Sequence, residues 1–196
     1  MALQVPQLSL REYLDAEEAS EVRHEYLNGE VFEMEAASIH HQTIAGNLIR
    51  RRGDCLDGQD CRVLPAPRTA TATNGLYTYP DVVIVCGRIE TWPTDRNTAA
   101  NPRVIIEVLS KTTEGYDRGR KFDSYLGLSS FVEYVCVAQD SAWILHQQRQ
   151  DDGSWVTRFV IGLDAVLSLT SLPAEISLAD IYRDVELSAD NAGFNA

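Results

Sequence analysis

A chain of 196 residues, 44% of them hydrophobic, is long enough to bury one core, and no Gly-, Ser- or Pro-rich linker divides it. Its 17 basic and 29 acidic residues give a net charge of −12, which opposes non-specific binding to nucleic acid because such binding needs clustered Lys and Arg. No segment approaches the roughly 20 apolar residues that span a bilayer, and the N-terminus lacks a signal-peptide core, so we expect a cytoplasmic protein with no membrane partner.

The absence of a composition break predicts a single domain over residues 1–186. A loosely ordered tail should follow over residues 187–196, which are mostly small and polar and contain no Ile, Leu or Val after Leu187. Disorder should therefore be confined to the ends of the chain.

The four cysteines do not form a recognisable framework. Cys86 and Cys136 lie in apolar runs typical of strands, whereas Cys55 and Cys61 flank a polar loop without C-x-x-C spacing. These positions favour reduced, mostly buried thiols and argue against a zinc site.

The first 55 residues predict a helix, a hairpin and a second helix. Ser9 is a suitable N-cap for a short amphipathic helix over about residues 9–19. Asn28-Gly29 lies between two alternating runs, and both residues accept the positive φ angles of a type I′ turn. Apolar residues on one helical face then predict a helix over about residues 39–55.

The remainder of the chain predicts mostly strands. We expect one or two short strands interrupted by prolines over 61–74, a strand closing at Gly87, and then a polar surface connection over 88–102. A strand over 103–110, a helix over 112–128 and a strand over 131–140 should follow. The last part predicts two strands over 141–162 joined by an Asp-Asp-Gly turn, and a short strand and a helix over 165–185. This order predicts an α/β fold in which helices pack on a mixed β-sheet.

The segment "NPRVIIEVLSK" (Asn101–Lys111) places a carboxylate inside an apolar strand. Side chains alternate between the two faces of a strand, so Glu107 shares its face with Ile105 and Leu109. Burying an ionised carboxylate without a partner costs several kcal/mol. Glu107 should therefore lie at the strand end, pair with a cation, or both.

A second unusual acid, Asp81, opens the apolar segment "PDVVIVCG". These two strands could bring Asp81 and Glu107 together at one end of a sheet, where the two carboxylates would raise each other's pKa unless a cation lay between them. Hard oxygen ligands without nearby His or thiolate favour Mg²⁺ or Mn²⁺, which can support phosphodiester hydrolysis. A nearby lysine would stabilise the developing negative charge or hold the attacking water.

The segments "PDVVIVCG", "VIIEVLSKTTEGYDRGRKFDSY" and "FVEYVCVA" are preceded by "HEYLNGEVFEM" and "HHQTIAGNL". Together they span about residues 8–140 and resemble the Uma-type family of bacterial restriction-endonuclease-like proteins, within the PD-(D/E)XK nuclease superfamily. The resemblance implies a mixed central β-sheet flanked by helices, with an N-terminal helix and hairpin. It also implies a Mg²⁺-dependent endonuclease.

Residue by residue, the resemblance implies that Asp81 and Glu107 bind the metal, with the backbone carbonyl of Val108 as a further ligand. The superfamily's lysine normally stands two residues after the glutamate, where this chain has Leu109. In the resembling family the lysine has moved into the following helix, which implies Lys121 as the catalytic lysine.

Other interpretations stay open at these positions. Lys111 competes with Lys121 because it stands where the family usually has proline. Asp117 and Lys121 are four residues apart on a predicted helix, a spacing that also suits an ordinary surface pair. Asp81 could be a turn residue after proline.

Glu25 matches an acid that is usual in the same family and implies an accessory catalytic role, with Glu30 across the turn as its alternative. Either could instead belong to the polar face of the hairpin. His40 and His41 open the second predicted helix and could contact a substrate phosphate, although histidines at helix starts are commonly surface residues.

Two functions remain open. The first is a Mg²⁺-dependent hydrolase of nucleic acid, with DNA as the expected partner, and the second is a non-catalytic module of the same fold that binds a protein or nucleic acid. Leu109 and the net charge favour the second, and the acid pair favours the first. A homodimer suits either function. "RRRGD" and "DRGRK" are the only local concentrations of positive charge, and they could form a funnel for a substrate.

Overall fold

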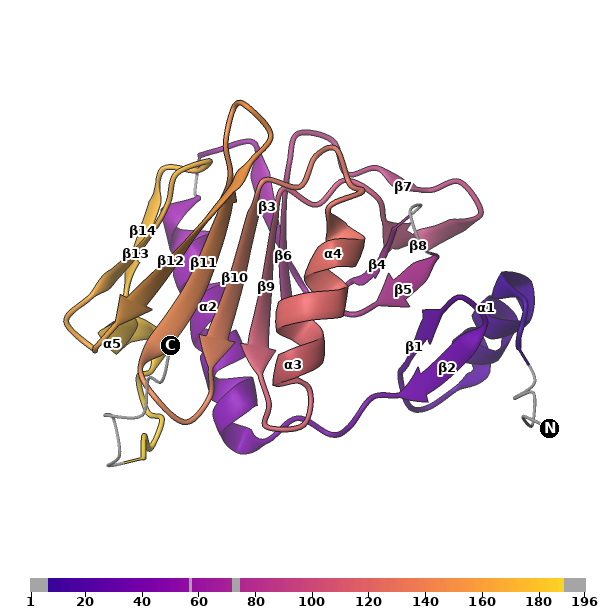
Figure 1. Ribbon diagram of the computed structural model, residues 1–196, viewed down its shortest axis with the longest axis horizontal. Coiled ribbons are helices and arrows are strands. Elements are labelled where there is room, and N and C mark those ends of the chain that lie inside the picture. Colours follow the sequence, from indigo (N-terminus) through magenta and orange to yellow (C-terminus); the bar gives the residue numbers. More distant parts are fainter. Residues whose placement is uncertain (1–6, 57, 72–74, 189–196) are drawn as a thin grey trace.

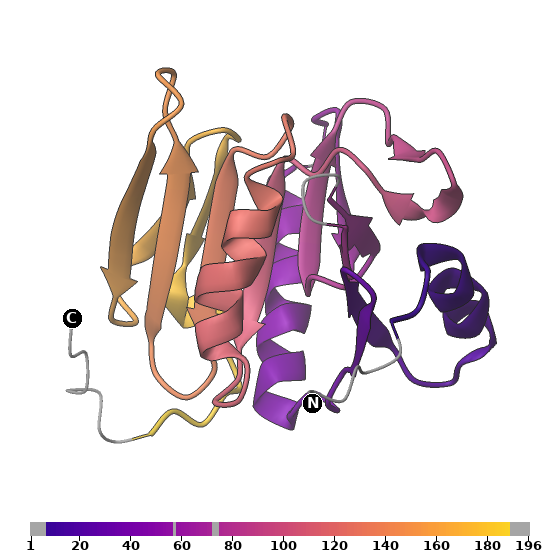
Figure 2. The same cartoon turned by 45° about the vertical axis from the view of Figure 1, so that its right-hand side comes forward.

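The chain folds into two neighbouring six-stranded sheets, with helices on both faces of the first (Figures 1 and 2). A computed structural model describes residues 7–56, 58–71 and 75–188, apart from the side chains of residues 52–55. The predicted α/β class is confirmed. None of the described helices combines the length and the apolar composition that crossing a membrane requires.

The first sheet occupies the centre of the molecule. Its strands lie in the order β12 (Trp155–Ile161), β11 (Trp143–Arg149), β10 (Glu133–Ala138), β9 (Val104–Leu109), β6 (Val82–Cys86) and β3 (Cys61–Pro65). β9 runs parallel to β10 and antiparallel to β6. Every residue of β9 and β10 is buried, because layers of side chains cover both faces of the sheet.

Different elements cover the two faces of this central sheet (Figure 1). One face packs against α2 (Ile39–Cys55) and against a small sheet of β13 (Val166–Leu169) and β14 (Ala174–Ser177). The other packs against a segment made of α3 (Glu114–Tyr116), the π-helical turn η1 (Asp117–Lys121) and α4 (Phe122–Tyr125). The strand with the unusual acid, β9, therefore lies between two helical layers.

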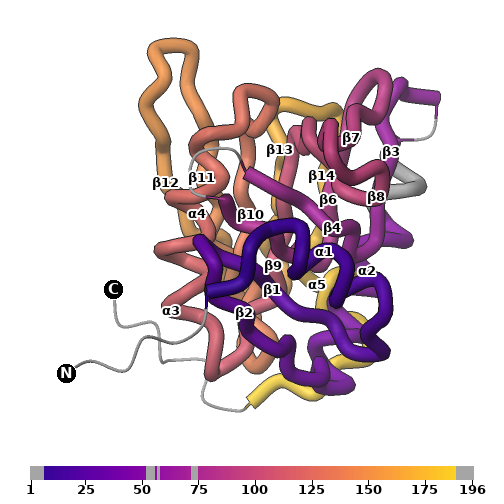
Figure 3. The backbone as a smooth tube through the Cα atoms, turned by 90° about the vertical axis from the view of Figure 1, so that its right-hand side faces the viewer, coloured from indigo at the N-terminus to yellow at the C-terminus, as the bar shows by residue number. Residues whose placement is uncertain are grey.

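The second sheet has the predicted hairpin at one edge. Its order is β2 (Glu30–Glu33), β1 (His24–Leu27), β5 (Leu76–Thr78), β4 (Arg68–Ala70), β8 (Asp95–Ala99) and β7 (Thr91–Trp92). Asn28 (φ 50°) and Gly29 (φ 97°) both take positive φ in the turn, which confirms the hairpin. Helix α1 (Leu10–Ala19) has Ser9 as its N-cap, as predicted, and lies beside this hairpin (Figure 3). Ser9 and Glu12 also form a capping box.

The prediction of a surface connection over residues 88–102 is wrong. This segment contains the hairpin of β7 and β8, and β8 joins β4 of the second sheet. Asp95 in β8 is buried and pairs with Arg68 at 2.7 Å, while Arg68 also donates a hydrogen bond to Thr98. The segment looks exposed in the sequence because the arginine that compensates the buried aspartate lies in a different strand.

The prediction of reduced thiols is wrong for two of the cysteines. Cys61 and Cys86 form a disulfide. They are direct partners in the antiparallel register of β3 and β6, with Cα atoms 3.9 Å apart, a relation that their separation in the chain does not reveal. Cys136 is free and buried, as predicted, and the side chain of Cys55 lies outside the described part.

The C-terminal part differs from the predicted strand and helix. Residues 166–177 form the two strands β13 and β14, and α5 (Leu178–Ile181) is a single turn. Leu187 packs against the core, and the backbone N–H of Ser188 donates to the carbonyl of Asp140. The first residues of the predicted tail therefore contact the sheet, and residues 189–196 lie outside the described residues.

Asp95→Ala should strongly destabilise the second sheet. The substitution leaves the guanidinium of Arg68 buried without its charged partner, and breaking such a pair typically costs about 3–5 kcal/mol. We expect the free energy of unfolding, measured with urea, to fall by about this amount. Asp15→Ala, which removes the exposed partner of Arg11, should leave it nearly unchanged. Equal effects of the two substitutions would contradict this prediction.

Candidate active site

Asp81 and Glu107 lie opposite each other on neighbouring strands of the central sheet. β6 and β9 pair through Val82 and Ile106, and one further step in this register sets Asp81 against Glu107. Glu107 is 3% exposed and points into the layer between the sheet and the α3–η1–α4 segment, on the face that the alternation predicts. The tertiary structure thus brings the two predicted acids together at one end of β6.

Both carboxylate oxygens of Asp81 are held in place. Oδ2 accepts a hydrogen bond from the backbone N–H of Val108 at 2.7 Å, and Oδ1 lies 2.7 Å from Nε2 of His41 in the first turn of α2. Asp81 therefore connects β6 with β9 and α2 and is more than a turn residue. Val108 takes part through its N–H, and the role of its carbonyl as a metal ligand stays a prediction.

Lys121 is the lysine that reaches the acids. Its Nζ lies 2.9 Å from Glu25 Oε1, 3.0 Å from Asp117 Oδ1 and 3.4 Å from Glu107 Oε1, and the residue is only 6% exposed. An ammonium group is stable at this depth because carboxylates surround it. The cation that Glu107 was expected to need is therefore supplied by the helical segment that follows β9.

The competing positions lie elsewhere. Lys111 pairs with Asp140 at 3.4 Å, and 87% of its side chain is exposed. His40 lies 4.0 Å from the same aspartate. Leu109, at the position of the usual superfamily lysine, is buried in the apolar layer beneath α4. None of these three side chains is paired with Asp81 or Glu107 in the described part of the chain.

The interpretation of Asp117 and Lys121 as a surface pair is wrong, because both side chains are buried. They begin and end the π-helical turn η1, and such turns often occur at functional sites. Thr113 donates its hydroxyl to Asp117 Oδ2 at 2.6 Å, and Tyr134 donates its hydroxyl to the Asp117 carbonyl at 2.8 Å. These bonds attach the turn to the start of the helical segment and to β10.

Glu25 brings the second sheet into the site. It lies on β1, is 7% exposed, and accepts a hydrogen bond from the hydroxyl of Thr78 on β5 in addition to its ion pair with Lys121. Glu30, its alternative, is exposed. The site therefore lies where the two sheets and the α3–η1–α4 segment meet.

Two tyrosines of the segment predicted as a helix over 112–128 also reach this layer. Tyr125 donates its hydroxyl to Glu107 Oε1 at 3.1 Å. The ring centroid of Tyr116 lies 5.6 Å from Lys121 Nζ. Tyr116 precedes Lys121 by five residues and Tyr125 follows it by four, so both lie on the same side of the helical segment as Lys121. This spacing is the feature of the sequence that could have predicted their place in the site.

The cluster carries an excess of negative charge, since four carboxylates (Glu25, Asp81, Glu107 and Asp117) accompany one lysine. Burial raises the pKa of Glu107 well above its ordinary range, and the neighbouring acids raise it further although Lys121 opposes them. Burial alone would lower the pKa of Lys121, but Glu107 and the groups around it outweigh burial and raise it well above its ordinary value. Lys121 is therefore a stable cation, whereas an ionised Glu107 would gain from additional positive charge.

The donor set suits Mg²⁺ or Mn²⁺ better than zinc. Mg²⁺ usually keeps several waters and binds proteins through one or two carboxylates, a number that Asp81 and Glu107 provide. A structural zinc site needs about four protein ligands. Across residues 7–56, 58–71 and 75–188, no three or more His, Cys, Asp or Glu side chains are grouped to hold a metal.

One arginine in each of the two predicted basic concentrations is paired with an acid. Arg51 pairs with Asp180 at 2.7 Å, and Arg118 pairs with Glu114 at 2.8 Å. A funnel of positive charge toward the acids therefore stays a prediction.

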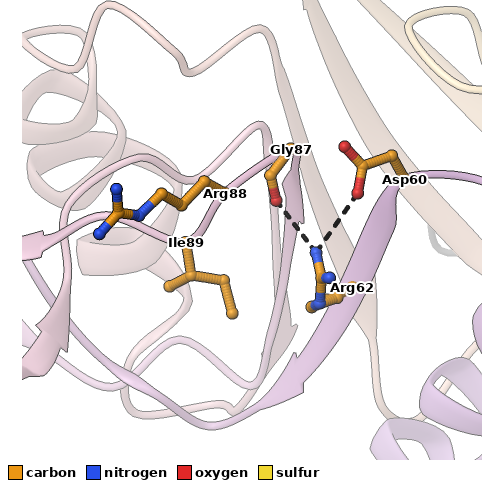
Figure 4. Close-up of a pocket in the computed structure, with 5 residues that line it drawn as sticks. All are labelled: Asp60, Arg62, Gly87, Arg88 and Ile89. Atoms are coloured by element: carbon orange, nitrogen blue, oxygen red, sulfur yellow. Dashed lines mark hydrogen bonds and ion pairs between the residues drawn. The ribbon is translucent and has the colours of Figure 1, made fainter.

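A surface pocket of about 430 Å³ lies at the end of β6 that is remote from Asp81, and its lining residues are Asp60, Arg62, Gly87, Arg88 and Ile89 (Figure 4). Arg62 there is held by the Gly87 carbonyl at 3.0 Å and by Asp60 at 3.5 Å (Figure 4). The pocket is separate from the acid cluster and contributes no residue to it.

Comparisons with known proteins identify a family and related sequences. The model of the Uma2 family, described as "Putative restriction endonuclease", matches residues 10–181. "Uncharacterized protein slr1290" from Synechocystis sp. is 34% identical over 182 residues, which cover 91% of this chain and 93% of the relative. "Uncharacterized protein sll1609" from the same organism is 26% identical over 164 residues, or 83% and 93% of the two chains.

A solved structure is similar in fold. A crystal structure from Anabaena variabilis, described as "a putative nuclease belonging to DUF820", superposes with a TM-score of 0.75 and covers 89% of this chain and 97% of its own. The two sequences are 16% identical, so this likeness concerns the fold alone. It confirms the predicted restriction-endonuclease-like architecture.

Lys121→Met should destabilise the protein in a pH-dependent way. Losing one partner of a buried ion pair typically costs about 3–5 kcal/mol near neutral pH. Lys121 lowers the pKa of Glu107, so its removal should raise that pKa further. A carboxyl whose pKa is higher in the folded than in the unfolded state makes the folded state less stable as the pH rises. Urea unfolding should show a small loss near pH 5 and a larger loss at pH 8. Lys111→Met is the control, and a loss that does not depend on pH would contradict the prediction.

Proposed function

The chain belongs to the Uma2 family, and we propose that it is a Mg²⁺-dependent endonuclease that hydrolyses phosphodiester bonds in nucleic acid. The observation that carries this proposal is the meeting of Asp81 and Glu107 on adjacent strands, with Lys121 Nζ 3.4 Å from Glu107. A lysine from the following helical segment takes the place of the one that the superfamily motif would put at Leu109.

Asp81, Glu107 and the backbone carbonyl of Val108 are the groups that we propose to hold Mg²⁺, with Mn²⁺ as a substitute. When bound, the ion acidifies a water molecule and polarises a phosphoryl oxygen. Each carboxylate oxygen of Asp81 accepts one hydrogen bond and keeps a further lone pair, so binding need not break the contacts with Val108 and His41.

Lys121 is the proposed catalytic lysine. Its raised pKa keeps it cationic, and a fixed positive charge beside Glu107 would stabilise the negative charge that develops on the phosphoryl group under attack. Glu25 holds the same ammonium from the second sheet, and this position supports the accessory role, as a ligand of metal or water, that the family resemblance implies. The positions of Lys121 and Glu25 both depend on the two sheets staying together.

We propose DNA as the substrate and a homodimer as the active assembly. The family description, restriction endonuclease, supports DNA, and two identical sites related by a two-fold axis suit the cleavage of two antiparallel strands. With a net charge of −12, affinity must come from local charges and from the metal rather than from overall attraction.

Glu107→Gln should abolish the binding of divalent metal. Isothermal titration with MnCl₂ should show at least about a 100-fold loss of affinity, since residues that merely support a metal site already contribute 10–100-fold. The substitution keeps the shape of the side chain, and circular dichroism should confirm an unchanged fold. Glu30→Gln is the matched control on the exposed face of the hairpin. Unchanged affinity in Glu107→Gln would remove the metal-site assignment.

Plasmid cleavage tests the activity itself. We expect the wild-type protein to nick supercoiled plasmid in MgCl₂ but not in EDTA, and Asp81→Asn and Lys121→Met to be slower by at least about 100-fold. Glu25→Gln should also be slower, while Glu30→Gln and Lys111→Met should match the wild type. Cleavage that survives in Asp81→Asn would point to a contaminating nuclease.

The same assay decides between the two candidate functions. A wild-type protein that binds metal but cleaves neither DNA nor RNA would contradict the proposed activity. The retained fold would then favour the non-catalytic binding module.

A further inference from the structure

The hydroxyl of Tyr116 lies beside the acid cluster. Its oxygen is buried and forms no well-aligned hydrogen bond with a described residue, although Glu25 lies near enough to raise its pKa. Tyr125, the other tyrosine of the cluster, differs because its hydroxyl donates to Glu107. Buried polar groups in folded proteins are nearly always hydrogen-bonded, so an unpaired hydroxyl in a candidate active site requires an explanation.

A second polar atom in the same place is also incompletely used. Asp117 Oδ1 is buried and lies 3.0 Å from Lys121 Nζ, yet it accepts no hydrogen bond from any described residue. Asp117 adjoins Tyr116 in the chain, and both side chains approach Lys121, one at 3.0 Å and the other with its ring centroid at 5.6 Å. Both side chains therefore lie next to the one lysine of the cluster.

We propose that Tyr116 is a further catalytic residue, whose hydroxyl and Asp117 Oδ1 together hold the attacking water next to Lys121. This inference rests on the proposed hydrolase activity. A buried water usually has two to four polar partners. The Tyr116 hydroxyl supplies one, and Asp117 Oδ1, which also contacts Lys121, keeps a lone pair for a second. The water would also lie close to the charge that stabilises the phosphoryl group.

The roles of the two groups follow from their chemistry. As the water oxygen bonds to phosphorus, the bond between phosphorus and the leaving oxygen breaks, and the electron pair stays on the leaving oxygen. The water proton passes to the Asp117 carboxylate and then to solvent, and the leaving oxygen takes up a proton from solvent. Tyr116 holds the water in line and is unchanged by the step.

The surroundings of Tyr116 keep its hydroxyl protonated. Burial raises the pKa of the tyrosine, and the nearby Glu25 raises it further. A neutral hydroxyl can both donate and accept a hydrogen bond, which suits a group that orients water.

Tyr116→Phe tests this proposal by separating activity from stability. Because no described residue forms a well-aligned hydrogen bond with the hydroxyl, its removal should leave the urea midpoint unchanged or raise it. The kcat for plasmid nicking should fall by at least about tenfold, while KM stays unchanged because the hydroxyl contacts the water and not the DNA.

Two further tyrosines provide matched controls. The hydroxyl of Tyr77 is also buried without a well-aligned hydrogen bond and lies near Thr94, but it belongs to the aromatic cluster of the second sheet, so Tyr77→Phe should leave kcat unchanged. Tyr125→Phe removes a hydroxyl that is bonded to Glu107 and should lower the urea midpoint.

Wild-type kcat in Tyr116→Phe, in an assay where Asp81→Asn is inactive, would overturn this proposal and leave the proposed function intact. A urea midpoint lowered as far as in Tyr125→Phe would also overturn it, because the hydroxyl would then have a structural partner. A wild-type protein without cleavage would overturn both the proposed function and this role of Tyr116.

Discussion

A lysine ammonium buried among carboxylates is the interaction on which the site depends. Lys121 is 6% exposed and contacts acids from three elements: Glu25 on β1, Glu107 on β9 and Asp117 on η1. A charge at such depth is stable only while all of these partners stay in place. The position of the hairpin, the register of the central sheet and the π-helical turn are thus constrained together by one side chain.

Both sheets contribute residues to this cluster. The central sheet, buried on both faces, sets Asp81 opposite Glu107 through the register of β6 and β9. The second sheet carries Glu25 to the same place and holds it with Thr78. Because each sheet supplies part of the cluster, the family's N-terminal helix and hairpin are structural components of the site and not an attached module.

The cluster combines several features that are unfavourable in the interior of a protein. Four carboxylates accompany one lysine, the pKa of Glu107 is raised, and two buried polar atoms lack hydrogen bonds to described residues. Functional sites commonly contain such unsatisfied groups because they serve a ligand rather than the apo protein. The surplus of negative charge supports the proposed metal site, and the two buried polar atoms support the proposed water site.

Local patterns determined much of this protein by themselves. Interactions between residues close in the chain predict the N-cap at Ser9 and the turn at Asn28-Gly29. The pattern of apolar residues likewise predicts the α/β class and shows that Glu107 lies within an apolar strand. Only the tertiary structure decided that Lys121 and not Lys111 joins the acids, that Asp95 is buried beside Arg68, and that Cys61 meets Cys86. These are relations between distant segments, and strand register and the packing of the two sheets set them. The spacing of residues along the chain does not determine which buried charged side chains pair with each other.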